Sequence, residues 1–490
     1  MPLLEETGYI PTEKYAKAPE LQEHCHRIGR HFGLYEKAIF HTEANTLQWD
    51  DVASRWIIKT DRGDTIRARF VATASGPLNM PKLPGVEGIE NFKGHSFHTS
   101  RWDYDFTGGD IRGHLDKIKD KRIAIIGTGA TAIQAVPHLG AGVEGGSGHL
   151  YVFQRTPSSV DIRANRKTDP DWVKSLKPGW QEERMINFLE AMNGKLTQEE
   201  DLVMDGWTKG STEMRRLGID RSDRTSLLEN AALFELADMQ VMESIRARCN
   251  EIVKDNKTAD ALKPWYRRFC KRPCFHDEYL QTFNIPNVSL VDTNGKGIER
   301  ITEKGIVANG QEYEVDCIIY STGFEVGTDY SRRSNFKVTG KNGIELSEHW
   351  NDGWHTFHGF HTREFPNLFV ISTAQSGFAA NFVHMLNEQS KHIGYLVKTC
   401  KERGIIVVEA SKEAEDAWVS QMLVGAMFTA SFQKECTPGY YNLEGKINEG
   451  RSRRQGNYPG GPLGFAKCLK EWQEKGDLEG LEIKKDDSGW

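Results

Sequence analysis

The alternation of apolar and polar positions predicts three kinds of segment. Residues 21–32 carry apolar side chains at helical spacing, whereas residues 46–76 favour short strands joined by turns. Residues 169–263 are charged and carry mostly helical patterns. A strand, a loop and a long helix follow in residues 364–400, and the tail after residue 437 is rich in loop residues. This order of strands and helices predicts an α/β protein.

Two of the predicted strands end in the same way. "FVATASG" (70–76) and "CIIYSTG" (317–323) are apolar runs that close on small residues and a glycine. Glycine at the carboxyl end of a strand lets a ligand or another backbone approach closely. The pair favours two related dinucleotide-binding domains, and two unrelated buried strands that happen to end in glycine are the alternative.

A phosphate-binding turn is predicted in "IAIIGTGATAIQA" (123–135). Here Gly127, Gly129 and Ala132 form a GxGxxA pattern between an apolar strand and a helix. The first glycine permits the tight turn, the second lets a pyrophosphate reach the backbone, and the alanine allows close packing of helix on strand. The free N–H groups of the helix start attract the phosphate. The predicted cofactor-binding residues therefore run through the whole turn: Gly127, Thr128, Gly129, Ala130, Thr131 and Ala132.

The following strand, "HLYVFQRTP" (149–157), indicates which dinucleotide binds. NAD-binding proteins place an acidic residue at this strand's end, but here Arg155 and Thr156 occupy it. A cation and a hydroxyl suit a 2′-phosphate, so the pattern predicts NADP(H), unless Arg155 is simply a surface residue. A second basic segment, "YRRFCKRP" (266–273), is either a solvated helix end or a source of cations in a cleft between domains.

Composition and charge argue against several classes of protein. The chain has 490 residues and a net charge of −6, which argues against a nucleic-acid binder driven by bulk charge. No apolar run approaches the roughly 20 residues that span a membrane, and the acidic start does not resemble a secretory signal. Eight scattered cysteines without metal-ligand spacing predict a reduced cytoplasmic protein and no metal site.

One segment, "NFKGHSFHTSRWD" (91–103), has neither the alternation of a strand nor the period of a helix, so a loop is expected. It resembles the fingerprint FxGxxxHxxxW(P/D) of class I Baeyer–Villiger monooxygenases. Related flavin-containing monooxygenases and N-hydroxylases usually lack the tryptophan. "QRTP", "KRP", "STGF" and "CTPGYYN" follow in the order found in that family. The fingerprint residues are Phe92, Gly94, His98, Trp102 and Asp103.

The resemblance implies a fold and a reaction. It implies two Rossmann-like domains: an FAD-binding domain built from residues 1–105 and 331–490, and an NADP-binding domain (106–330) with a helical insertion at about 169–263. It also implies that FAD, reduced by NADPH, reacts with O₂, and that one oxygen atom is inserted beside a ketone carbonyl to give an ester or lactone. We therefore expect a small-molecule ketone substrate and no nucleic-acid partner.

The resemblance also assigns roles to residues. Arg272 matches the family's active-site arginine, whose fixed charge would stabilise an oxyanion. Lys271, Arg155 and Thr156 match positions that hold the 2′-phosphate, and Gln134 matches one near the same cofactor. His98 and Trp102 are expected on a linker that couples cofactor binding to domain motion.

One expected motif is absent from the sequence. No GxG pair precedes residue 73, although the family carries a GxGxxG turn for FAD there. We therefore expect an N-terminally truncated FAD domain, and two hypotheses follow: a fragment of an active monooxygenase, or an inactive NADP(H)-binding paralogue that holds FAD poorly. N- or S-oxygenation is a further alternative that Trp102 and Asp103 disfavour. Loops in 165–265 and 376–385 are expected to select the ketone, which the sequence does not identify.

Overall fold

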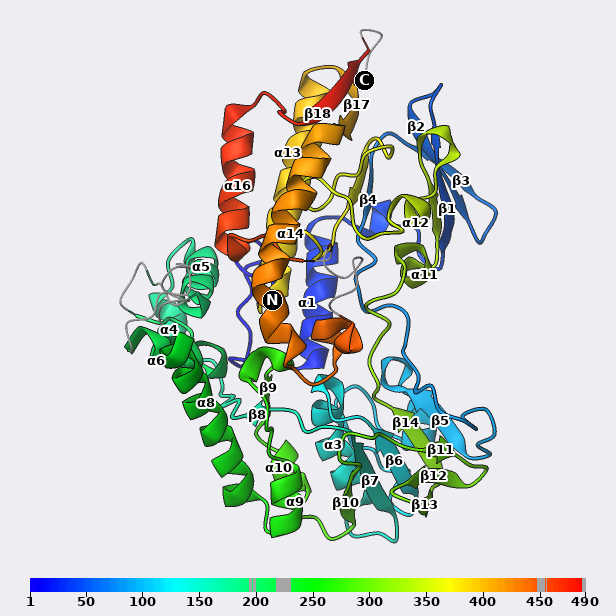
Figure 1. Cartoon of the computed structure of the whole chain (residues 1–490), viewed down its shortest axis with the longest axis vertical. Helices are drawn as coiled ribbons and strands as arrows, with labels where there is room; N and C mark the ends of the chain where they lie inside the picture. The colour runs from blue at the N-terminus through cyan, green and yellow to red at the C-terminus, as the bar shows by residue number, and fades with distance from the viewer. Residues whose placement is uncertain (194–195, 197–199, 217–230, 447–453, 455, 487–490) are drawn as a thin grey trace.

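The computed structural model describes the chain except residues 194–195, 197–199, 217–230, 447–453, 455 and 487–490. Figure 1 shows two lobes stacked along the long axis. The lower lobe contains a parallel sheet, the upper lobe contains two long helices and a strand meander, and a group of helices lies at one side. Parts of the loops expected to select the ketone lie outside the described residues.

A five-stranded parallel sheet forms the lower lobe, in the order β10-β7-β6-β14-β5. Parallel strands buried on both faces carry continuous apolar runs, which is the pattern of "IAIIG" and "CIIY". This topology confirms the predicted α/β fold for the GxGxxA half of the chain. The strands are β5 (His95–His98), β6 (Arg122–Ile126), β7 (His149–Gln154), β10 (Val288–Asp292) and β14 (Cys317–Tyr320).

Alternate side chains of β6 fill two separate cores. Ile123 and Ile125 pack on the side of α3 (Ala130–Val143) and α10 (Tyr279–Thr282), whereas Ala124 and Ile126 pack on the other side. A three-stranded meander covers that second side, so both sheet faces are buried. The meander consists of β11 (Arg300–Ile301), β12 (Gly305–Ala308) and β13 (Gln311–Glu314).

The expectation of a loop across the fingerprint is wrong at its centre. His95–His98 form β5, which pairs in parallel with β14 at the edge of the five-stranded sheet. An edge strand of four residues needs no long apolar alternation, because its neighbour supplies the hydrogen bonds. The segment continues into η2 (Thr99–Arg101) and α2 (Tyr104–Thr107).

The insertion is helical, as its pattern predicted. It packs as a layer of helices beside the lower lobe (Figure 1). Its described helices are α4 (Pro170–Ser175), α5 (Trp180–Met192), α6 (Gly206–Arg216), α8 (Ala231–Ile252) and α9 (Asn256–Ala261). It returns to the sheet through η3 (Arg268–Cys270) and the short pair β8 (Val160–Asp161) and β9 (Cys274–Phe275).

The upper lobe contains the second strand that ends in glycine, β4 (Val71–Thr73). It pairs in parallel with β16 (Leu368–Val370), and the two make a sheet of their own. The expectation that residues 70–76 form a buried apolar strand holds only in part, because Thr73 is buried but Ala72 is exposed. β14 differs because it has sheet partners on both sides and all four of its residues are buried.

The rest of the upper lobe surrounds this pair. A four-stranded sheet has the order β15-β1-β2-β3. Its strands are β1 (Ala44–Asp50), β2 (Arg55–Thr60), β3 (Thr65–Ala68) and β15 (Lys337–Thr339). A two-stranded antiparallel sheet beside it is formed by β17 (Ile405–Ala410) and β18 (Leu481–Lys485). The helices are α11 (Tyr330–Ser334), α12 (Leu346–His349), α13 (Phe382–Glu402), α14 (Lys412–Lys434) and α16 (Gly461–Lys475), with 3₁₀ turns η4 (Lys341–Gly343) and η5 (Tyr440–Gly445).

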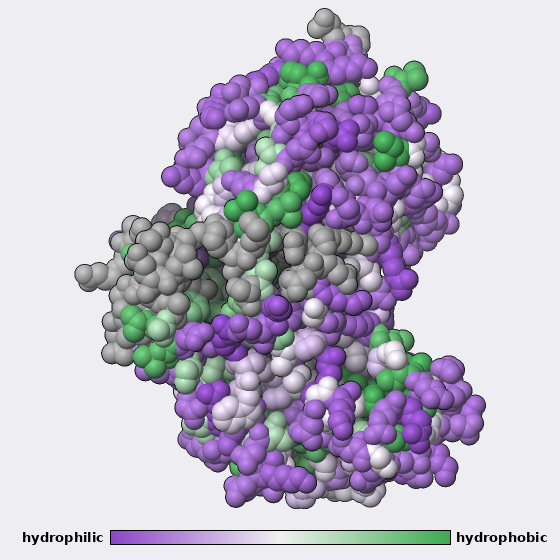
Figure 2. Space-filling model, viewed as in Figure 1, coloured by the Kyte–Doolittle hydropathy of each residue, from purple (hydrophilic) through white to green (hydrophobic). Residues whose placement is uncertain are grey.

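The predicted N-terminal helix exists as α1 (Ala18–His31), and the 3₁₀ turn η1 (Tyr35–Lys37) follows it. Its apolar face is not buried: Leu21 and Phe32 are each 43% exposed, whereas His24 is buried. The outer surface is mostly hydrophilic and is indented between the two lobes (Figure 2). Within the part of the chain that the structure describes, no helix is long and apolar enough to cross a membrane.

Candidate functional site

The GxGxxA turn has the geometry that phosphate binding requires. Gly127 adopts φ 112°, and a β-carbon there would lie 2.5 Å from the carbonyl oxygen of Ser321 on the neighbouring strand end. Gly129 caps α3 without a side-chain hydrogen bond, and a β-carbon there would meet no atom within 4 Å. The backbone is therefore crowded at Gly127 and open at Gly129, where the N–H groups at the start of the helix are accessible to an anion.

The other residues of the turn hold it in place. Ala132 is fully buried against the sheet, as its predicted packing role requires. The Thr128 hydroxyl donates to the carbonyl of Thr156 (3.0 Å), which ties the turn to the end of β7. Gln134 is exposed, and its side chain donates back to the carbonyl of Ala130 (2.8 Å). Thr131 is exposed at the first turn of the helix.

The structure brings the predicted 2′-phosphate residues together. Lys271 Nζ donates to Thr156 Oγ1 (2.6 Å), although 115 residues separate the two. Burial, helped by the charge of Arg155, lowers the pKa of Lys271 to about 8. The charged form of this partly buried amine is disfavoured by burial and by the neighbouring arginine. A bound anion would stabilise that charged form.

Two further charged residues, Lys82 and Glu444, join this cluster, and no local sequence pattern indicated either of them. Lys82 Nζ lies 3.2 Å from a carboxylate oxygen of Glu444, and Arg155 Nη2 lies 3.2 Å from the other oxygen. Lys82 is placed by backbone hydrogen bonding to Gly323, the glycine that closes β14. These contacts join residues from four distant parts of the chain, so no local pattern contains them.

Arg272 lies next to the cation cluster, after η3, and is exposed. It interacts with the hydroxyl of Tyr440. The pKa of Tyr440 is raised, chiefly by burial, while its contacts with Tyr441 and Arg272 act in the opposite direction. The expected catalytic role of Arg272 stays a prediction.

The fingerprint residues build a corner at the end of β5. His98 is buried, its Nδ1 lies 2.8 Å from Ser100 Oγ, and the backbone of Gly323 also interacts with its ring. Burial lowers the pKa of His98, so the ring is neutral at pH 7. Its edge meets the ring of Phe324, which follows Gly323. His98 therefore connects the fingerprint to the end of β14.

The remaining fingerprint residues have structural contacts. Trp102 Nε1 donates to Thr107 (3.1 Å), and Asp103 caps α2 by accepting from Phe106 N (3.0 Å). Gly94 has no space for a side chain, because a β-carbon there would lie 2.4 Å from the ring of Phe92. The proposed coupling of this segment to domain motion stays a prediction.

The expectation that the cysteines are all reduced is wrong for one pair. Cys270 and Cys436 form a disulfide across 166 residues. It joins the residue before Lys271 to the start of the segment that carries Tyr440 and Glu444. The two cysteines lie so far apart in the chain that no local pattern indicated this pairing.

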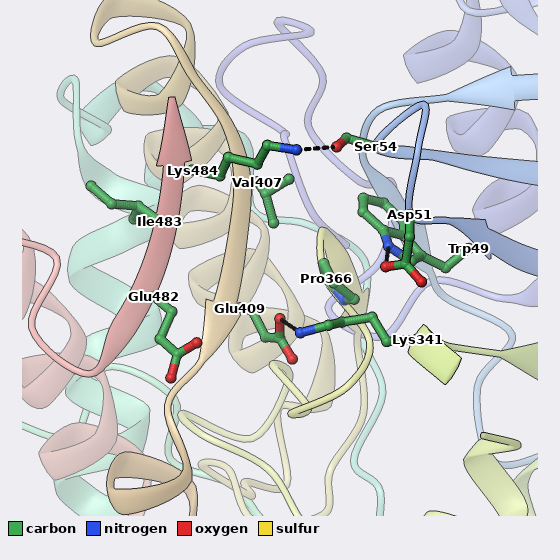
Figure 3. A pocket seen from close by; sticks show the side chains of 10 residues that line it. All are labelled: Trp49, Asp51, Ser54, Lys341, Pro366, Val407, Glu409, Glu482, Ile483 and Lys484. Atoms are coloured by element: carbon green, nitrogen blue, oxygen red, sulfur yellow. Dashed lines mark hydrogen bonds and ion pairs between the residues drawn. The ribbon is translucent and has the colours of Figure 1, made fainter. Parts of the chain in front are cut away.

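A separate pocket of about 210 Å³ lies in the upper lobe, between the β1–β2 turn and the two-stranded sheet of β17 and β18 (Figure 3). Two of its lysines already have partners: Lys341 Nζ forms an ion pair with Glu409 (2.9 Å), and Lys484 Nζ donates to the hydroxyl of Ser54 (3.3 Å). The nucleotide-binding turn lies in the other lobe (Figure 1), so this pocket is not part of the candidate site.

No family model matches the chain, but several known proteins resemble it. Neopentalenolactone D synthase of Streptomyces avermitilis is 50% identical over 490 residues, which are 99% of this chain and 81% of that protein. Baeyer-Villiger monooxygenase ATR8 of Stachybotrys chlorohalonatus is 50% identical over 484 residues (99% and 77%).

Solved structures agree with these relatives. The polycyclic ketone monooxygenase of Thermothelomyces thermophila is 39% identical with a TM-score of 0.89, over 99% of this chain and 80% of that one. An oxidized steroid monooxygenase bound to NADP is 25% identical with a TM-score of 0.78 (99% and 88%). Close identity along almost the whole sequence and a shared fold lead to one conclusion: the chain belongs to the Baeyer–Villiger monooxygenase family.

Proposed function

We propose that this protein is an FAD- and NADPH-dependent monooxygenase of the cytoplasm. It inserts one atom of O₂ beside the carbonyl of a ketone and releases an ester or lactone. The observation that supports this most directly is the group of Arg155, Thr156 and Lys271 beside the GxGxxA turn, with Arg272 adjacent. Because a relative is named for polycyclic ketones, this class is the first substrate to test.

The described residues fit NADP(H). The open backbone at Gly129 suits the pyrophosphate, and Arg155, Thr156 and Lys271 suit the 2′-phosphate, since all three donate hydrogen bonds. Lys271 is a partly neutral amine in the free protein, and a bound phosphate would favour its charged form.

FAD fits the same residues only in part. Gly76 closes β4 with φ 70° and open space beside it, as the end of a second nucleotide site would require. Residues 1–490 contain no second GxGxx(G/A) turn to face it. We propose that residues 1–490 hold FAD less firmly than NADP(H).

The residues of the chain contribute binding and charge. When bound, FAD supplies the activation of oxygen. The guanidinium of Arg272 can donate hydrogen bonds to the negative oxygen that forms when the ketone carbonyl is attacked, and so stabilises it. Lys271 and Arg155 orient NADPH through its 2′-phosphate, far from the reacting atoms. His98, neutral and buried, adds no charge at the end of β14.

The test is to purify the chain, record its flavin absorption band, and follow NADPH oxidation and ester formation with a polycyclic ketone. Arg272→Ala should lower the rate of ester formation about 10²- to 10³-fold and leave NADPH binding nearly unchanged. Arg267→Ala is the matched control, since Arg267 pairs with Glu435 outside the cluster. A colourless protein that binds NADPH but makes no ester would instead support the inactive NADP(H)-binding alternative.

A further inference from the structure

The segment Cys436–Lys446, here called the strap, lies against the predicted 2′-phosphate site. Asn442 is buried at its centre and organises it: its side chain donates to the carbonyls of Cys436 and Thr437 and accepts from the N–H groups of Gly439 and Gly445. In Figure 1 this orange turn lies directly above α3. The strap is therefore an ordered turn.

The disulfide fixes the start of the strap. Cys436 is bonded to Cys270, and Cys270 precedes Lys271 directly. The strap therefore stays within reach of the cation cluster whether or not a nucleotide is bound, which keeps its local concentration high.

Glu444 is the part of the strap that enters the cluster. Its two carboxylate oxygens lie 3.2 Å from Lys82 Nζ and 3.2 Å from Arg155 Nη2. Arg155 Nη2 also donates to the carbonyl of Pro438 (3.3 Å). The pKa of Glu444 is lowered: burial raises it, but Lys82 and Arg155 together outweigh burial. The carboxylate is therefore an anion bound where the sequence places the 2′-phosphate.

The backbone at this point is strained. Leu443 (φ 51°, ψ 44°) and Glu444 (φ 59°, ψ 37°) are both left-handed, which costs free energy for residues other than glycine. Two successive residues hold this conformation while the carboxylate pairs with two cations.

We propose that Glu444 is an internal competitor for the 2′-phosphate and so sets the preference of this protein between NADPH and NADH. The inference rests on the proposed NADP(H) site. A 2′-phosphate must displace the carboxylate from Arg155 and Lys82 or bind beside it against like-charge repulsion. NADH carries no such phosphate and does not compete, so Glu444 weakens NADPH binding selectively.

The experiment measures dissociation constants of NADPH, NADH and adenosine 2′,5′-bisphosphate for the full chain and for Glu444→Gln. Loss of the negative charge should tighten the binding of NADPH and of the bisphosphate about three- to fivefold, as expected for partly exposed pairs, and leave NADH within twofold. Glu435→Gln is the matched control, because this neighbouring carboxylate pairs with Arg267. It should change none of the three constants.

A double variant tests whether the effect of Glu444→Gln acts through the charge of Arg155. In the background of Arg155→Ala, the added Glu444→Gln should give a smaller gain in NADPH affinity than in the wild type, since the shared partner is gone. The inference is overturned if Glu444→Gln leaves the ratio of the NADPH and NADH dissociation constants unchanged, or if it strengthens the binding of both nucleotides equally. Wild-type protein that binds neither NADPH nor the bisphosphate overturns the proposed function as well.

Discussion

At the scale of single residues, Lys271 makes cofactor binding sensitive to pH. The amine is mostly protonated at pH 7, and because its pKa is about 8 it loses its charge well below the usual range of lysine. A protonated amine attracts the 2′-phosphate and a neutral amine does not. The affinity for NADPH must therefore fall as the pH rises.

The measurement is the dissociation constant of NADPH between pH 6.5 and 9.5. In the wild type it should rise above about pH 8, toward a loss of about tenfold, whereas NADH binding should change little. Lys271→Met should bind NADPH weakly at every pH and show no step near pH 8. A step that persists in the variant would show that another group is responsible.

The sequence predicted the cofactor residues where they are local. Gly127, Gly129 and Ala132 form one turn, so their spacing alone indicated their use. Lys82 and Glu444 were missed because folding brings them to Arg155 from segments far away in the chain. Contacts of this kind depend on tertiary structure, and a single sequence carries no signal for them.

At the scale of elements, the turn between β6 and α3 contains two glycines that we expect to affect different properties, nucleotide binding and thermal stability. Gly129→Ala adds a methyl group where the protein has open space, so the thermal midpoint should stay within 2 °C of wild type, as is usual for surface substitutions. The same methyl group lies where a pyrophosphate would approach, so NADPH should bind about tenfold more weakly.

Gly127→Ala is the contrasting variant. It needs φ 112° and would place its β-carbon 2.5 Å from the Ser321 carbonyl, so it should lower the thermal midpoint as well as NADPH binding. Equal unfolding temperatures for the two variants would contradict this distinction.

The disulfide between Cys270 and Cys436 joins η3 to the end of α14. Cys436→Ser should lower the free energy of unfolding by about 2–4 kcal/mol, because the unfolded chain gains a long open loop. Urea unfolding under non-reducing conditions measures the change. Dithiothreitol should bring the wild type to the level of the variant and leave the variant unchanged. Cys25→Ser is the control, since Cys25 is a free, exposed thiol.

The elements themselves were predictable where the pattern is long. The strand–turn–helix at residues 122–143 and the helical insertion follow from periodicity, and the structure confirms both. The fingerprint strand β5 was missed because four residues show no reliable alternation, and pairing with β14 decides its conformation. The pattern of β4 predicted a buried strand, but burial depends on neighbours that the local sequence does not specify.

At the scale of the whole molecule, the N-terminal region leaves apolar side chains in solvent. Six large ones between residues 21 and 40 are at least 41% exposed: Leu21, Phe32, Leu34, Tyr35, Ile39 and Phe40. Apolar surface of this kind favours association with other surfaces.

We expect the protein to self-associate as its concentration rises, which sedimentation velocity measures. Ile39→Ser combined with Phe40→Ser should shift the distribution toward the monomer. Val52→Ser is the control, because Val52 is 97% exposed but lies outside this region. A distribution that does not change with concentration in the wild type would contradict the expectation.

The two strands that end in glycine, β4 and β14, should also differ in the rate at which their amides exchange hydrogen with solvent. β14 is hydrogen-bonded on both sides, so its amides should exchange only when the nucleotide-binding lobe opens. β4 has β16 as its partner in the described structure, and Ala72 is exposed, so deuterium should enter this strand far sooner. Mass spectrometry of peptides covering 70–76 and 317–323 makes this comparison within one protein. Similar deuterium uptake in both peptides would mean that β4 is protected from solvent by contacts beyond its pairing with β16. If uptake in β4 slows when FAD is added, the protected surface belongs to the second nucleotide site.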